Sequence, residues 1–69
     1  MTGRFVVQIK SPEGVFGDAW IDFAGHEDVA GACRDARVET VDNARVRSRV
    51  MDTVHAVVIA EFQQGERVR

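Results

Sequence analysis

The spacing of the apolar residues changes twice along the chain, and this change limits the folds open to it. Apolar residues recur at every second position before Phe23 and again after Ala44, which is typical of half-buried β-strands. Between Val29 and Thr40 they recur three and four positions apart, as on one face of an α-helix. The pattern predicts a single two-layer α+β domain over residues 1–69, with one helix on one face of an antiparallel four-stranded sheet, in the order ββαββ.

The first two strands are predicted to form a hairpin. Alternation over residues 4–10 indicates the first strand, and residues 11–14, Ser-Pro-Glu-Gly, have the chemistry of a type I turn. Alternation over residues 15–23 indicates the second strand, with Phe23 inward and Trp20 outward.

The helix is predicted to begin after Glu27 and Asp28, whose negative charges suit the unpaired N–H groups of a helix N-terminus. Its inner face is made of small residues, which allow close approach to the sheet and cost little side-chain entropy. These residues are Val29, Ala32, Cys33, Ala36 and Thr40.

Two further strands are predicted after the helix. Residues 44–51 alternate, with a row of arginines on the outward face, and residues 54–62 are apolar on both parities, as in a central strand. The arginine strand can also lie at a sheet edge, where charges discourage aggregation. Residues 63–69 are polar and are predicted to be a frayed C-terminal tail.

A chain of 69 residues can bury only one thin core. Such a core rarely supplies more than about 3–5 kcal/mol, so small domains commonly add disulfides, a metal or a second subunit. Cys33 has no second cysteine to pair with, and the two histidines lie too far apart for a common zinc pattern. We therefore expect no metal or cofactor, no membrane association, a location in the reducing cytoplasm, and stabilisation by self-association or by a partner.

The sheet face opposite the helix is the candidate binding surface. It is predicted to have an apolar centre, including the single tryptophan, and a charged rim. Trp and Arg are enriched at protein-binding hot spots, and clustered exposed apolar residues commonly mark a partner site. The candidate partner-binding residues are Trp20, Val6, Val57, Ile59, Arg45, Arg47 and Arg49.

Several interpretations of this surface remain open. It can form a homodimer or bind a different protein, or Trp20 can lie over an arginine stem and bind nothing. The arginine row can instead follow the phosphates of a nucleic acid, with Trp20 stacked on a base. The net charge of −2 and the acidic residues Asp18 and Asp22, placed to pair with the arginines, favour an ion-paired face over that alternative.

Catalysis is not expected. Cys33 lies on the apolar stripe of the helix, where cysteine behaves as a small hydrophobe. His26, Glu27, Asp28 and His55 could form an acid–base or metal set only if the end of the second strand approached the fourth, and carboxylates at a helix start commonly act as caps.

Three short segments carry a resemblance. They are the tryptophan–aspartate element at 20–23, the acidic start of an alanine-rich helix at 27–30 and the end of the arginine strand at 50–53. In this layout the chain resembles small uncharacterised accessory proteins of bacteriophages and high-GC bacteria. No site residue is carried over from that group. The resemblance implies a protein that binds a host protein stoichiometrically and inhibits or redirects it.

Overall fold

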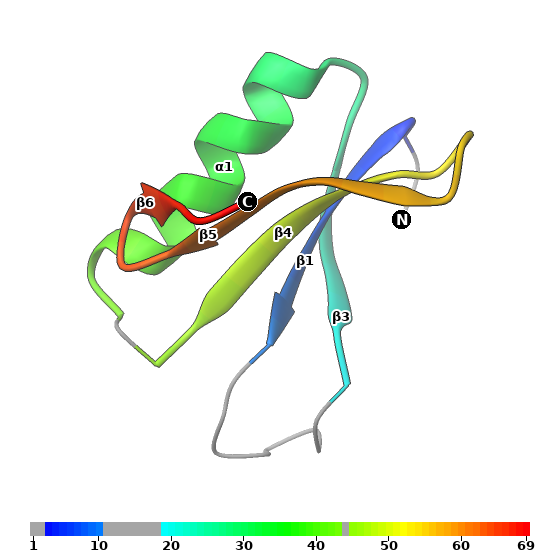
Figure 1. Ribbon diagram of the computed structural model, residues 1–69. Helices are drawn as coiled ribbons and strands as arrows, with labels where there is room; N and C mark the ends of the chain where they lie inside the picture. The colour runs from blue at the N-terminus through cyan, green and yellow to red at the C-terminus, as the bar shows by residue number, and fades with distance from the viewer. Residues whose placement is uncertain (1–2, 11–18, 44) are drawn as a thin grey trace.

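The computed structural model describes residues 3–10, 19–43 and 45–69, which form one α-helix and an antiparallel β-sheet (Figure 1). The elements are β1 (Phe5–Lys10), β3 (Ile21–His26), α1 (Val29–Val41), β4 (Arg47–Asp52), β5 (Val57–Gln63) and β6 (Glu66–Arg67). The five strands pair in the spatial order β3-β1-β4-β5-β6. The α+β class is confirmed, and the described sheet has one strand more than predicted.

The core lies between α1 and the face of the sheet that this helix covers (Figure 1). On the helix, Ala32, Ala36 and Thr40 are fully buried, as the stripe of small residues predicts. Because these side chains are short, the helix axis can approach the strands closely. The sheet contributes four buried apolar residues, Val7, Val50, Ala60 and Phe62.

Hydrogen bonds cap the start of the helix and join the helix to the sheet. Asp28 is the N-cap and accepts a hydrogen bond from the N–H of Gly31 at 2.5 Å, which confirms the predicted acidic start. Ser48 of β4 donates its hydroxyl to the carbonyl of Ala36. Near the other end, the hydroxyl of Thr40 accepts from the N–H of Gly65 at 2.9 Å, so the helix is tied to both β4 and the β5–β6 turn.

Two β-bulges change which face some residues occupy. Opposite Val7 and Gln8 of β1, Phe23 is an extra residue in β3, and Ile59 is an extra residue in β5 opposite β4. An extra residue reverses the alternation beyond it. The prediction of an inward Phe23 is therefore wrong, because its side chain is 40% exposed. The outward Ile59 is also a wrong prediction, because this residue packs against the core.

The strand order decides one open alternative and corrects one prediction. β4, the arginine strand, is the middle strand of the described sheet, so it does not lie at an edge. β5 is not central, because beyond β4 it pairs only with the two residues of β6. Both strands also begin later than predicted: Arg45 precedes β4, and residues 54–56 form a turn in which Ala56 has a φ of 55°.

Most of the C-terminal segment forms regular structure along β5. Gln63 ends β5, and Glu66 and Arg67 pair with Gln63 and Phe62. The N–H of Val68 donates to the carbonyl of Glu61 at 2.8 Å. The predicted tail from residue 63 is therefore replaced by a turn and a short strand along β5.

Some predictions lie outside the described residues. These are the type I turn at 11–14 and the first part of the second strand, 15–18. None of the described helices has the length and hydropathy needed to cross a lipid bilayer.

Candidate functional site

The predicted apolar centre of the outer face, the sheet face opposite α1, is not continuous. Val6 is only 5% exposed, and Ile59 belongs with the core rather than with this face. Val57 is 48% exposed but lies at the start of β5, beside the β4–β5 turn. Val6 and Ile59 therefore offer a partner little of the apolar surface predicted for them, whereas Phe23, which the sequence predicts inward, is 40% exposed.

Trp20 is half-buried beneath basic side chains. The guanidinium carbon of Arg49 lies 4.3 Å from the centroid of the Trp20 ring, and the ammonium of Lys10 lies 5.9 Å from it. These distances are those of cation–π contacts. Trp20 precedes β3, which begins at Ile21 rather than at the predicted residue 15, and its ring lies against Arg49 as the purely structural interpretation expects.

Hydrogen bonds link Trp20's neighbours in a row across the outer face. Arg49 Nε donates to Gln8 Oε1 at 2.7 Å, and Gln8 Nε2 donates to Asp22 Oδ1 at 2.8 Å. Arg47 lies 3.8 Å from a carboxylate oxygen of Glu61. Burial lowers the pKa of Arg49 from its ordinary value, and Glu61 acts against this shift. Asp22 therefore bonds to Gln8, which in turn accepts from Arg49, in place of the expected direct pairing of Asp22 with an arginine.

Arg45 does not join Arg47 and Arg49 in one strand row. It lies in the turn before β4, where its backbone N–H donates to the side-chain oxygen of Asn43 at 3.1 Å. A strand that presented all three arginines at regular spacing could follow successive phosphates. The structure brings only Arg47 and Arg49 together on β4.

Each histidine pairs with its own aspartate. His55 Nδ1 lies 2.9 Å from Asp52 Oδ2, and His26 Nε2 lies 2.8 Å from Asp35 Oδ2. The hydrogen bond to the His55 side chain lowers the pKa of Asp52 to about 2, with help from the N–H groups of His55 and Val54 and from Arg4, against the effect of burial. No group of three His, Cys, Asp or Glu residues able to hold a metal occurs within residues 3–10, 19–43 and 45–69.

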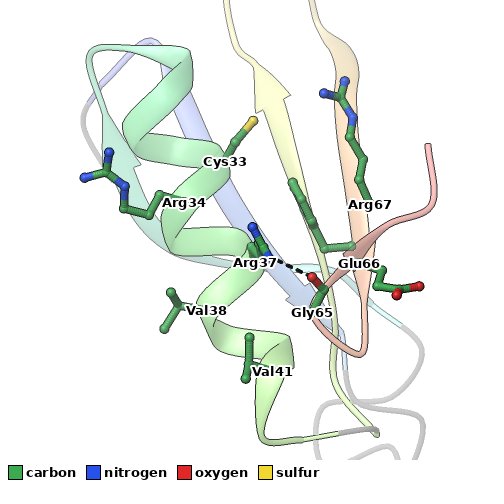
Figure 2. Close-up of a pocket in the computed structure, with 9 residues that line it drawn as sticks. Cys33, Arg34, Arg37, Val38, Val41, Gly65, Glu66 and Arg67 are labelled. Atoms are coloured by element: carbon green, nitrogen blue, oxygen red, sulfur yellow. Dashed lines mark hydrogen bonds between the residues drawn. The ribbon is translucent and has the colours of Figure 1, made fainter.

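A second surface, which the sequence reasoning missed, lies between α1 and the β5–β6 turn (Figure 2). It is a groove of about 740 Å³, which we call the edge groove. That volume falls in the range of binding pockets, about 300–1,000 Å³. The edge groove is lined by Cys33, Arg34, Arg37, Val38, Val41, Phe62, Gly65, Glu66 and Arg67.

The apolar part of the edge groove is partly open to solvent. Val38 is 59% exposed and Val41 is 55% exposed, whereas Phe62 is buried and Cys33 is half-buried. In Figure 2 the Cys33 side chain points toward the strands, and Val38 lies at the outer rim of the helix. Val41 contacts the turn closely, since a Cβ added to Gly65 would lie 3.1 Å from a methyl group of Val41.

Backbone carbonyls hold two of the arginines that line the edge groove. Arg37 Nε donates to the carbonyl of Gly65 at 2.9 Å, as the dashed line in Figure 2 shows. Arg67 Nε donates to the carbonyl of Arg69 at 2.8 Å, and Arg67 Nη2 donates to that of Ile59 at 3.0 Å. The two guanidinium groups are therefore positioned by main-chain oxygens.

A signal for the edge groove is present in the sequence. Val38 and Val41 are apolar helix residues that fall outside the predicted inner stripe, and Arg34 lies one turn before Val38. This second, exposed apolar stripe indicates a helix face that can pack against another surface. What it faces depends on β6, which the sequence does not predict.

No protein-family model matches the chain, and neither the curated proteins nor the solved structures gave a match. The interpretation of both surfaces therefore rests on the side chains of this protein.

Proposed function

We propose that this chain is a non-enzymatic protein-binding module that contacts its partner through the edge groove. The observation that carries the proposal is that exposed valines and arginines line the same groove, and that this groove has the volume of a ligand-binding pocket. Exposed apolar surface with a polar rim is characteristic of partner sites, and arginine is enriched in them.

The edge groove is a better candidate than the outer face because the side chains of the outer face already bond to one another. The polar groups of Gln8, Asp22 and Arg49 already bond to one another, and the Trp20 ring already contacts Arg49. A partner would have to replace these contacts. The outer face around Trp20, with Arg47, remains the second candidate surface, since half-buried tryptophan and arginine are common hot-spot residues.

A partner would also supplement the small core. Seven apolar residues are buried in the described part of the chain, and three of them are alanines. A second copy of this chain, as a homodimer, or a host protein bound stoichiometrically would each shield further apolar surface from water. A host-protein inhibitor of the phage accessory type fits this proposal.

Nucleic-acid binding through Arg45, Arg47 and Arg49 is the alternative function, and we favour it less. Arg47 has Glu61 as a neighbour and Arg49 is held by Gln8, so a phosphate would compete with existing partners. The net charge of −2 also opposes association with a polyanion.

The test compares one substitution on each surface. Light scattering over a concentration series at low and moderate salt gives the solution mass, and immobilised protein is used in parallel to retain partners from a host extract. Val38→Ser is expected to weaken self-association or retention of a stoichiometric partner by about tenfold, or about 1.4 kcal/mol. Trp20→Ala is expected to leave the same association within about twofold of the original, because a substitution away from the contact surface changes the free energy by no more than about 0.5 kcal/mol.

Circular dichroism in the far ultraviolet checks that both variants stay folded. If Trp20→Ala abolishes the association and Val38→Ser does not, the outer face is the binding surface and the edge groove is not.

A further inference from the structure

We infer that the edge groove recognises an acidic, extended peptide segment of a partner protein. The inference rests on the proposed function and specifies the chemistry of the ligand. Carboxylates of the peptide would pair with arginines of the edge groove, and an apolar side chain between them would cover Val38 and Val41.

The local charge of the edge groove is opposite to that of the whole chain. The chain has nine basic and eleven acidic residues, for a net charge of −2. The edge groove has three arginines, Arg34, Arg37 and Arg67, and one acidic residue, Glu66. The Glu66 side chain points away from α1 (Figure 2). A positive surface on an acidic protein favours a negatively charged ligand at that place.

Two arginines outside the edge groove lie beside carboxylates, whereas those of the edge groove do not. Arg4 lies 3.5 Å from an oxygen of Asp52, and Arg47 lies 3.8 Å from one of Glu61. Within the described residues, no aspartate or glutamate forms an ion pair with Arg34, Arg37 or Arg67. No aspartate or glutamate of the described residues therefore competes for these three arginines with a carboxylate from outside.

Arg37 and Arg67 are also organised in advance for such a ligand. Their Nε atoms are held by main-chain carbonyls, and a guanidinium has five N–H donors, so several donors of each remain for a carboxylate. Arginine pairs with a carboxylate through two parallel hydrogen bonds, and a fixed guanidinium loses less side-chain entropy on binding. The geometry thus favours a carboxylate over a diffuse counter-ion.

The apolar residues of the edge groove favour a peptide over a nucleic acid. Single-stranded nucleic acids are held by exposed aromatic rings on which bases stack. The aromatic residue here is Phe62, which is only 5% exposed, whereas the accessible apolar surface is the aliphatic Val38 and Val41. Aliphatic side chains of a peptide suit that surface.

The peptide would lie beside β5 rather than extend the sheet. An added strand needs free carbonyl and N–H groups along a sheet edge. At this edge the carbonyl of Ile59 accepts from Arg67 Nη2, and that of Glu61 accepts from the N–H of Val68. Recognition in the edge groove would therefore come from side chains, which makes the arginines the main source of specificity.

Fluorescence anisotropy with a synthetic probe tests the inference. The longest dimension of the protein is 30 Å, so an extended peptide of about nine residues can span it. The probe is a dye-labelled peptide of that length with leucines at its centre and glutamates on both sides. Two control peptides replace every glutamate with glutamine or with lysine.

The acidic peptide is expected to bind most tightly, the glutamine peptide at least about fivefold more weakly, and the lysine peptide more weakly still. Added salt should reduce these differences, because the arginines are exposed. Arg34→Glu, at an exposed helix position whose side chain forms no hydrogen bond with the described residues, should weaken binding of the acidic peptide by about five- to tenfold.

Matched substitutions outside the edge groove serve as controls. Arg45→Glu makes the same charge change in the turn before β4, and Val54→Ser matches Val38→Ser at another exposed valine, in the β4–β5 turn. Binding of the acidic peptide should be retained by both controls and weakened by Val38→Ser.

Equal binding of the acidic and glutamine peptides, or equal loss in Arg34→Glu and Arg45→Glu, would overturn the inference. If Val38→Ser still weakened the association in that case, the proposed function would stand with an uncharged ligand. If light scattering showed a dimer that Arg34→Glu disrupts, the occupant would be a second copy of this chain and the foreign peptide would be ruled out.

Discussion

Replacing Val50 with alanine tests whether the core lies where the structure places it. Val50 is fully buried in the middle strand of the sheet and faces α1 in one cluster with Val7 and Ala36. The substitution removes two methyl groups without adding a polar atom, so its effect measures packing alone.

The size of the effect follows from the burial of Val50. Two buried methyl groups contribute about 1.6 kcal/mol to the free energy of unfolding at about 0.8 kcal/mol each, which is the cost if the surroundings close completely. If a cavity remains, the loss rises toward about 3 kcal/mol. Since a core of this size supplies about 3–5 kcal/mol, Val50→Ala should remove about half of the stability.

Urea unfolding followed by circular dichroism measures this loss. The midpoint should fall with little change in the slope, because the unfolded chain exposes nearly the same surface. Val54→Ala is the matched control: Val54 is 68% exposed, and this variant should stay within about 0.5 kcal/mol of the original protein. A loss below about 0.5 kcal/mol in Val50→Ala, or equal losses in the two variants, would show that the helix does not cover this strand.

Two further predictions concern charge. The pKa of Asp52 is lowered to about 2 in the folded protein, below the value of about 3.9 expected in the unfolded chain. The stabilisation from Asp52 is therefore complete above about pH 4 and is lost as the pH falls toward 2. Urea unfolding at several pH values should show this decline, and Asp52→Asn should flatten it in that range; an unchanged decline would assign it to other carboxyl groups. Binding of single-stranded DNA, measured by anisotropy at two salt concentrations, should be weak, and reversing the charges of Arg47 and Arg49 should not change it. Tight, salt-sensitive binding that this reversal abolishes would favour the nucleic-acid function.

The parts of the fold that depend on local spacing were predictable from the sequence. Asp28 caps the helix as expected, and Ala32, Ala36 and Thr40 lie on the buried stripe. In β4, alternation correctly places Ser48 and Val50 on the buried face. These assignments succeed because the side-chain periods of helices and strands are properties of the backbone itself.

The positions of Phe23 and Ile59 could not be predicted in the same way. Each is the extra residue of a bulge, and a bulge exists only relative to a partner strand. The sequence of β5 gave a warning, because its apolar residues occupy both parities. That pattern fits a strand covered on both faces as well as one whose alternation is shifted by a bulge.

The candidate site shows the same division between local and tertiary information. The amino-acid sequence alone determined the type of most elements and the small-residue face of the helix. Only the tertiary structure decided which arginines meet carboxylates: Arg47 meets Glu61, whereas Arg37 and Arg67 are held by main-chain carbonyls beside a groove. The physical reason is that compensation of a charge depends on neighbours in space, and strand order and the β5–β6 turn bring those neighbours together from distant parts of the chain.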